Sequence, residues 1–239
     1  MGPNAVKQRA PMTHPHTESP LNPLPPVVVA LSLLIVAVEV VLNLGARGII
    51  GGPGAIGWRL AAVQDYAFSG RVLAWMLETG QMPPEQLMRF VTYPFVHGSF
   101  THALFAVVML LALGKMVGEG MGNLATAVIF VGSGIGGALV YGLAVPDGAP
   151  LLGAFPPIYG LIGGFTYLLW VRLGEMGAQQ IRAFSLIGIL LGLQLVFTLL
   201  FGSGQEWVAD IAGFAVGFGL SVLLVPGGLA RILARLRRD

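Results

Sequence analysis

The stretch GAFPPIYGL, residues 153–161, joins a short glycine-containing segment to an apolar run. Proline is tolerated in the first turn of a helix, because the amide hydrogen that it lacks would have no partner there. The residue before a proline is pushed towards an extended conformation. We therefore predict that Phe155 ends a loop that dips into the protein and that a helix begins at Pro156. The apolar run that follows is about 20 residues long, which is the length of a membrane span.

The rest of the chain has the composition of an integral membrane protein. Of its 239 residues, 55% are hydrophobic and only 10% are charged, and the mean hydropathy is +0.80. A soluble domain of this length is far more polar. The chain contains no cysteine, so neither disulfides nor thiolate chemistry can be invoked.

Six windows are long and apolar enough, or nearly so, to span a bilayer. They cover residues about 25–45, 101–119, 123–145, 154–173, 182–202 and 206–227. The predicted fold is therefore an all-α membrane domain of six helices, from residue 24 to 228. We expect residues 1–23 to form a disordered cytoplasmic tail and residues 229–239 a basic cytoplasmic tail.

The segment 46–100, between the first two windows, is too long to be a plain connector. It carries aromatic and apolar residues, so we expect it to lie outside, in the membrane interface, as short amphipathic helices. Arg89 and His97 are expected to fix this loop onto the second span through hydrogen bonds.

Positive charges predict the orientation of the chain. Four arginines crowd the last nine residues, which places the C-terminus in the cytoplasm, and six spans then place the N-terminus there as well. We interpret this basic tail as an anchor to the membrane surface and not as a nucleic-acid site. The lipid bilayer is thus an expected partner, and nucleic acid is not.

Small residues recur within the predicted spans. Gly213 and Gly217 are four residues apart and share one helix face, which lets another backbone approach closely. Asp210 lies on the same face, three residues before Gly213, and points into the bundle. We predict that these three residues and Tyr159 serve helix packing or contact with a partner helix.

Four features in the same order resemble the rhomboid family of intramembrane serine proteases. They are the stretch MRFVTYPFVHGSFTHALFA at 88–106, the six-span layout, GAFPPIYGL in the fourth span and ADIAGFAVGF at 209–218. The resemblance covers roughly residues 25–228. It implies a six-helix bundle with a long first loop, located in a bacterial inner membrane.

In active rhomboids the fourth-span motif is glycine, any residue, serine, glycine, and a histidine in the sixth span activates the serine. The resemblance places Phe155 at the serine, Pro156 at the second glycine and Asp210 at the histidine. His102 matches a histidine donor of the oxyanion hole, but Ala106 stands where an asparagine donor belongs. The resemblance therefore implies a pseudoprotease, with Phe155 plugging the substrate cleft.

Several polar residues in the spans leave alternatives open. Asp210 is either hydrated near the outer end of its span, or it pairs with His102 or His97 or contacts a client helix. Glu39 and Asn43 share a face of the first span and either bond inside the bundle or extend outward. His97, His102 and Asp210 lack the spacing of a metal site, so no metal or cofactor is expected.

Two functions follow from these observations. By analogy with inactive relatives such as iRhoms and derlins, the chain is expected to bind the transmembrane helices of a partner protein, as an adaptor or an accessory subunit. The alternative is an unconventional protease in which Ser133 pairs with His97 or His102. The simpler interpretation of Ser133 is a small packing residue between Gly132 and Gly134.

Overall fold

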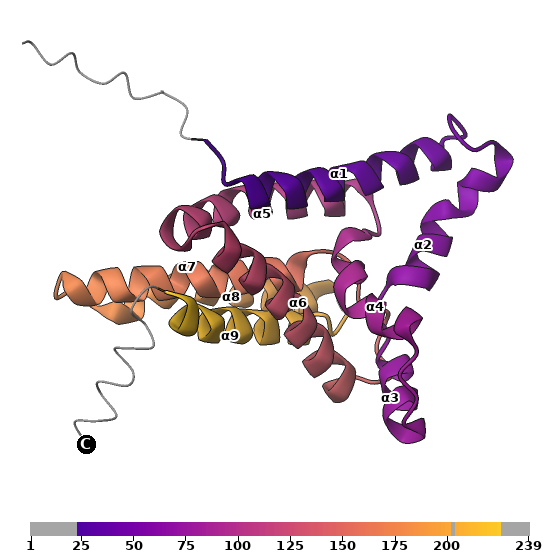
Figure 1. Cartoon of the computed structure of the whole chain (residues 1–239). Coiled ribbons are helices and arrows are strands. Elements are labelled where there is room, and N and C mark those ends of the chain that lie inside the picture. The colour runs from indigo at the N-terminus through magenta and orange to yellow at the C-terminus, as the bar shows by residue number, and fades with distance from the viewer. Residues whose placement is uncertain (1–22, 202–203, 226–239) are drawn as a thin grey trace, which may run out of the picture.

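The computed structural model describes residues 23–201 and 204–225 (Figure 1). The predicted tails, apart from residue 23, lie outside these residues. Six long helices occupy the six predicted windows, and this confirms the all-helical membrane fold. They are α1 (Pro26–Ala46), α5 (Phe100–Met121), α6 (Asn123–Ala144), α7 (Phe155–Glu175), α8 (Ser185–Phe201) and α9 (Trp207–Leu224).

Four of these helices are long and apolar enough to cross a membrane: α1, α5, α6 and α9. The central helix of the bundle is α7, which packs against α5, α6 and α9. Every residue from Pro156 to Gly164 is buried. Because protein and not lipid surrounds this stretch, α7 tolerates glycine, proline and tyrosine that a lipid-facing helix would lack.

The start of α7 differs from the prediction by one residue. The turn before the helix depends on Gly153, whose φ of +88° is accessible to glycine at little cost. Ala154 is the N-cap, and the helix begins at Phe155 and not at Pro156. The extended bias on a residue that precedes proline is only a preference, and here it is overridden where the Phe155 ring packs against His102.

The small-residue face of α9 lies against α7. A methyl group added to Gly213 would overlap the carbonyl oxygen of Pro156, and one added to Gly217 would overlap that of Gly160. The close backbone approach predicted for these glycines therefore takes place inside the bundle. This face of α9 is covered by α7 and is not a surface for a partner helix.

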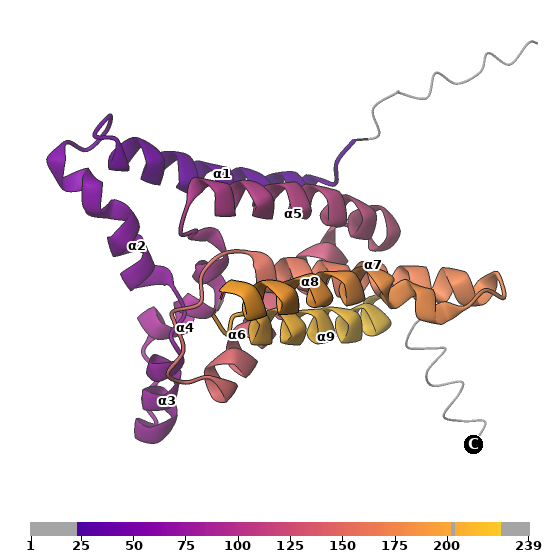
Figure 2. The same ribbon diagram turned by 180° about the vertical axis from the view of Figure 1, so that it is seen from behind.

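The long loop folds into short helices, as predicted. They are η1 (Pro53–Gly57), α2 (Trp58–Tyr66), α3 (Gly70–Thr79), α4 (Pro84–Thr92) and η2 (Tyr93–Phe95), and a third 3₁₀ segment, η3 (Gln180–Phe184), precedes α8. Figures 1 and 2 show α2, α3 and α4 gathered at one side of the long helices. An interfacial position of these helices stays a prediction.

The loop is anchored differently from the prediction. Arg89 donates from Nη1 to the carbonyl oxygen of Ala67 at 2.8 Å, so it joins α4 to the end of α2 and does not reach α5. The Tyr93 hydroxyl donates to the carbonyl oxygen of Gly134 in α6 at 2.9 Å. The first turn of α5 instead has a local cap, because Ser99 Oγ accepts from the His102 amide at 3.2 Å.

The α7–α9 contact gives a test of the packing. We expect Gly217→Ala to lower the free energy of unfolding by about 1–3 kcal/mol, because the new methyl group forces two backbones apart. Gly219→Ala on the same helix is the matched control, since a methyl group there meets nothing within 4 Å. Unfolding of the purified variants in detergent measures both, and equal stability of the two would contradict the close contact.

Candidate functional site

A cleft with a volume of about 680 Å³ opens beside the first turns of α5, α7 and α9. Its walls also include residues of α8 and the segment 149–152, which leads into α7. Most of the lining is apolar. The polar and charged side chains in it are His102, Tyr159, Gln194, Glu206 and Asp210.

Phe155 forms part of the cleft wall. Its ring stacks on that of His102, with ring centroids 5.2 Å apart and an angle of 11° between the planes. His102 in turn meets His97 edge to face, with centroids 5.0 Å apart. Because the cleft stays open beside this stack, Phe155 lines the cleft and does not plug it, in contrast to the prediction.

Asp210 lies in the first turn of α9 and is only 5% exposed. Its Oδ2 accepts a hydrogen bond of 3.0 Å from Gln194 Nε2 on α8. The expected hydration of Asp210 is therefore wrong, and so is its expected pairing with His97 or His102. Gln194 of α8 lines the same cleft as Asp210, whereas His102 is stacked on Phe155.

His97 fixes the turn that precedes α7. Its side chain is fully buried, and Nε2 accepts a hydrogen bond of 3.3 Å from the Ala154 amide. Burial, together with the nearby His102, lowers the pKa of His97 from 6.5 to about 4. The imidazole is therefore neutral at physiological pH. Its hydrogen bond attaches the loop to the start of α7, while its ring also contacts His102 of α5.

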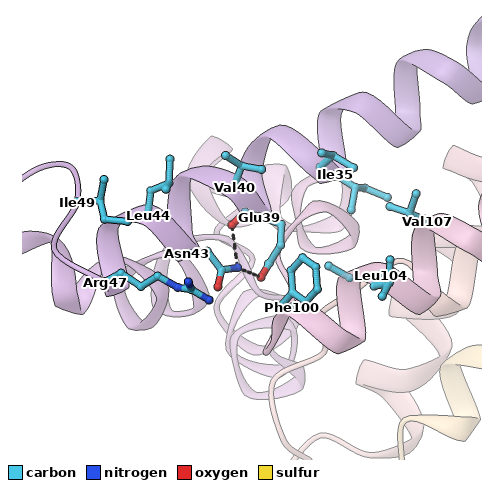
Figure 3. A pocket seen from close by; sticks show the side chains of 12 residues that line it. Ile35, Glu39, Val40, Asn43, Leu44, Arg47, Ile49, Phe100, Leu104 and Val107 are labelled. Carbon is cyan, nitrogen blue, oxygen red and sulfur yellow. Dashed lines mark hydrogen bonds between the residues drawn. The ribbon is translucent and has the colours of Figure 1, made fainter.

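Glu39 is buried on α1 and forms an ion pair with Arg59 of α2. Arg59 Nη2 lies 2.7 Å from Oε1, and Nη1 lies 3.0 Å from Oε2, which is the two-pronged geometry typical of arginine and carboxylate. The Asn43 amide donates to the Glu39 carboxylate and, at 3.1 Å, to its carbonyl oxygen (Figure 3). Of the two alternatives for Glu39 and Asn43, bonding inside the protein is the correct one.

The sequence analysis does not identify Arg59 as the partner of Glu39, although the sequence contains an indication of this pair. A carboxylate in the middle of an apolar span requires a cation, and the long loop supplies arginines close by in the chain. Arg59 Nη1 also donates to the His97 carbonyl oxygen at 2.5 Å. A continuous series of polar contacts thus runs from Glu39 on α1 through Arg59 and His97 to Ala154 at the start of α7.

Ser133 and Ala106 are both fully buried. Ser133 is fully buried in α6 against Gly160, and its hydroxyl has no hydrogen-bond partner among the described residues. Neither His97 nor His102 therefore activates it. Ala106 is fully buried in α5 and offers no side-chain donor. Among the described residues, no three histidine, aspartate or glutamate side chains are placed to hold a metal ion.

Comparisons with known proteins agree on one family. A family model described as the Rhomboid domain matches residues 84–227. RHOMBOID-like protein 4 of Arabidopsis thaliana is 24% identical over 140 residues, which are 57% of this chain and 34% of that protein. Rhomboid-type serine protease 2 of Emericella nidulans is 26% identical over 148 residues, 61% of this chain and 29% of that protein.

RHOMBOID-like protein 5 of Arabidopsis thaliana is similar at the same level, with 25% identity over 138 residues, 57% of this chain and 44% of that protein. The chain thus spans less than half the length of the curated relatives that it matches. The matched region of the family model includes the cleft residues of α5, α7, α8 and α9.

The buried ion pair predicts a large effect of removing one partner. Glu39→Ala leaves the Arg59 guanidinium, which is only 21% exposed, without its carboxylate. We expect a loss of about 3–5 kcal/mol in the free energy of unfolding. Asp147→Ala is the control, because the Arg71–Asp147 pair is 74% and 87% exposed and is worth about 0–1 kcal/mol. A loss at Glu39 no larger than at Asp147 would contradict the structural role of the pair.

The neutral His97 predicts a dependence of stability on pH. The unfolded chain takes up a proton near pH 6.5, whereas the folded chain resists protonation down to about pH 4. Stability is therefore complete above pH 6.5 and falls towards pH 4, with a slope of up to about 1.4 kcal/mol per pH unit. In His97→Gln, whose amide oxygen still accepts from Ala154, this component should vanish. Unfolding curves of the two proteins that stay parallel from pH 4 to 7 would refute the assignment.

Proposed function

The chain belongs to the rhomboid family, and from this premise we propose that it is a proteolytically inactive member that binds the transmembrane helix of a partner protein. It acts as an adaptor or as an accessory subunit of a membrane complex. The observation that supports the proposal is an open, largely apolar cleft beside which Phe155 offers no nucleophilic atom and Asp210 accepts from Gln194.

The chemical part of the proposal rests on Phe155 and Asp210. A phenyl ring has no nucleophilic atom, and among the described residues Asp210 is bonded to Gln194 and to no hydroxyl nucleophile. Ala106 offers no donor to an oxyanion, and the loss of one such donor alone costs about 10²–10³ in rate. Ser133 is buried away from the cleft lining, which argues against the alternative protease.

The binding part of the proposal rests on α8 and the apolar walls of the cleft. Leu190 and Leu193 of α8 line it, and Leu193 is 52% exposed. Ile189 and Val196 of the same helix are also exposed, at 69% and 49%. In a membrane protein such side chains meet either lipid or another helix, so a partner helix has an apolar route along α8 to the cleft.

The proposal includes the location of the protein. The described helices and the family establish an integral membrane protein. We propose that both termini lie in the cytoplasm, on the basis of the arginines near the C-terminus, and that the membrane is a bacterial inner membrane, as the family resemblance implies.

Photo-crosslinking in the native membrane tests the proposal. A photoreactive residue in place of Leu193 should crosslink to one or a few membrane proteins, whereas the same residue at Leu124, which is 79% exposed on α6 away from the cleft, should crosslink to lipid alone. Purification in mild detergent then separates an accessory subunit, recovered near one to one, from an adaptor, recovered with several substoichiometric clients.

The proposed lack of proteolytic activity is tested separately, by chemical labelling. We expect no labelling by a serine-directed fluorophosphonate. Labelling that disappears in Ser133→Ala would establish the protease alternative and overturn the proposed inactivity. Identical crosslinking patterns at positions 193 and 124 would overturn the proposed binding.

A further inference from the structure

The charged side chains of the cleft all have one sign. Glu206 and Asp210, both at the start of α9, line it, and none of the described lining residues is a lysine or an arginine. Arg59, the nearest arginine of the long loop, is occupied by Glu39 and by the His97 carbonyl oxygen. The cleft therefore presents two carboxyl groups, with no lysine or arginine among its described lining residues.

One oxygen of the Asp210 carboxyl group lacks a hydrogen-bond donor. Gln194 satisfies Oδ2, but Oδ1 is buried and has no hydrogen-bond donor in the described part of the chain. Gln194 is also neutral, so it does not compensate the charge. A buried carboxylate is costly unless it is both hydrogen-bonded and paired with a cation.

The position of Asp210 near the N-terminus of α9 does not explain why its carboxyl group is buried without a cation. A carboxylate is favoured there when it accepts from the free amides of the first turn. The α9 N-cap, Glu206, makes no side-chain capping bond, and the Asp210 side chain accepts its hydrogen bond from Gln194 of α8. The side chain thus faces across the cleft and not back onto its own helix.

Aromatic rings complete this environment. Phe155 and Tyr159 of α7 line the same cleft as Asp210. The faces of such rings attract cations, and most strongly where water is scarce. Two carboxylates and two aromatic rings around an apolar cleft form a site suited to a lysine or arginine side chain on an otherwise apolar helix.

We propose that the cleft selects a partner helix that carries a lysine or arginine side chain within its apolar span, and that Asp210 accepts this cation. The inference rests on the proposed function and specifies the partner's chemistry. A cation in a transmembrane helix is unfavourable in lipid, so such a helix gains most from an anionic, protein-lined site. The long, flexible stems of lysine and arginine can extend from the partner helix along the apolar walls towards Asp210.

Two synthetic transmembrane peptides test the inference on the full chain in phosphatidylcholine vesicles. They are apolar helices that differ at one internal position, lysine in one and norleucine in the other. With the photoreactive residue in place of Leu193, we expect the lysine peptide to crosslink at about tenfold lower concentration, as a charged hydrogen bond allows. Asp210→Asn should abolish this preference, and Asp147→Asn, at an exposed site outside the cleft, should retain it.

The outcomes separate this inference from the proposed function. Equal crosslinking of the two peptides would overturn the selection of a cation and leave helix binding intact, whereas no crosslinking of either would overturn both. Competition by a water-soluble lysine peptide at equal concentration would show that the occupant is not a membrane helix. If Asp210→Asn does not fold, the apolar variant Asp210→Leu carries the test, and a full preference for the lysine peptide in that variant would overturn the inference.

Discussion

The ion pair between Glu39 and Arg59 is the interaction on which the geometry of the cleft depends. Two charges in a region of low dielectric are held there only because the guanidinium meets both carboxylate oxygens. The same guanidinium contacts the His97 carbonyl oxygen, and His97 accepts from Ala154. One charged group thus fixes α1, the long loop and the start of α7 relative to one another, although these elements lie far apart in the sequence.

The second constraint is the close contact of α7 and α9. Glycines at 160, 213 and 217 bring two backbones together without side chains between them. This contact determines how Phe155 and Asp210 face the cleft, because each lies in the first turn of one of these helices. α8 has no comparable glycine contact in its described part, since added methyl groups at Gly188 and Gly192 meet nothing within 4 Å. The backbones of α7 and α9 are therefore held together beside the cleft, whereas the position of α8 depends on side-chain contacts.

Sequence reasoning succeeded where the signal was local. Apolar windows located all six long helices, and the spacing of Gly213 and Gly217 gave the close-packing face of α9. It failed where the answer depended on elements distant in the chain. The partners of Asp210 and Arg89 are Gln194 and Ala67, and no spacing rule selects these residues from the many polar groups available.

Asp210 is a buried carboxylate whose two oxygens differ in their surroundings. Burial demands a partner for a carboxylate, and the described part of the chain supplies the neutral Gln194, which satisfies one oxygen. A residue that served folding alone would be expected to have both oxygens satisfied, or to be replaced by an apolar side chain at little cost. The unsatisfied oxygen therefore favours an interaction made outside the chain. Under the proposed function, Asp210 would then serve as a binding group in the same cleft.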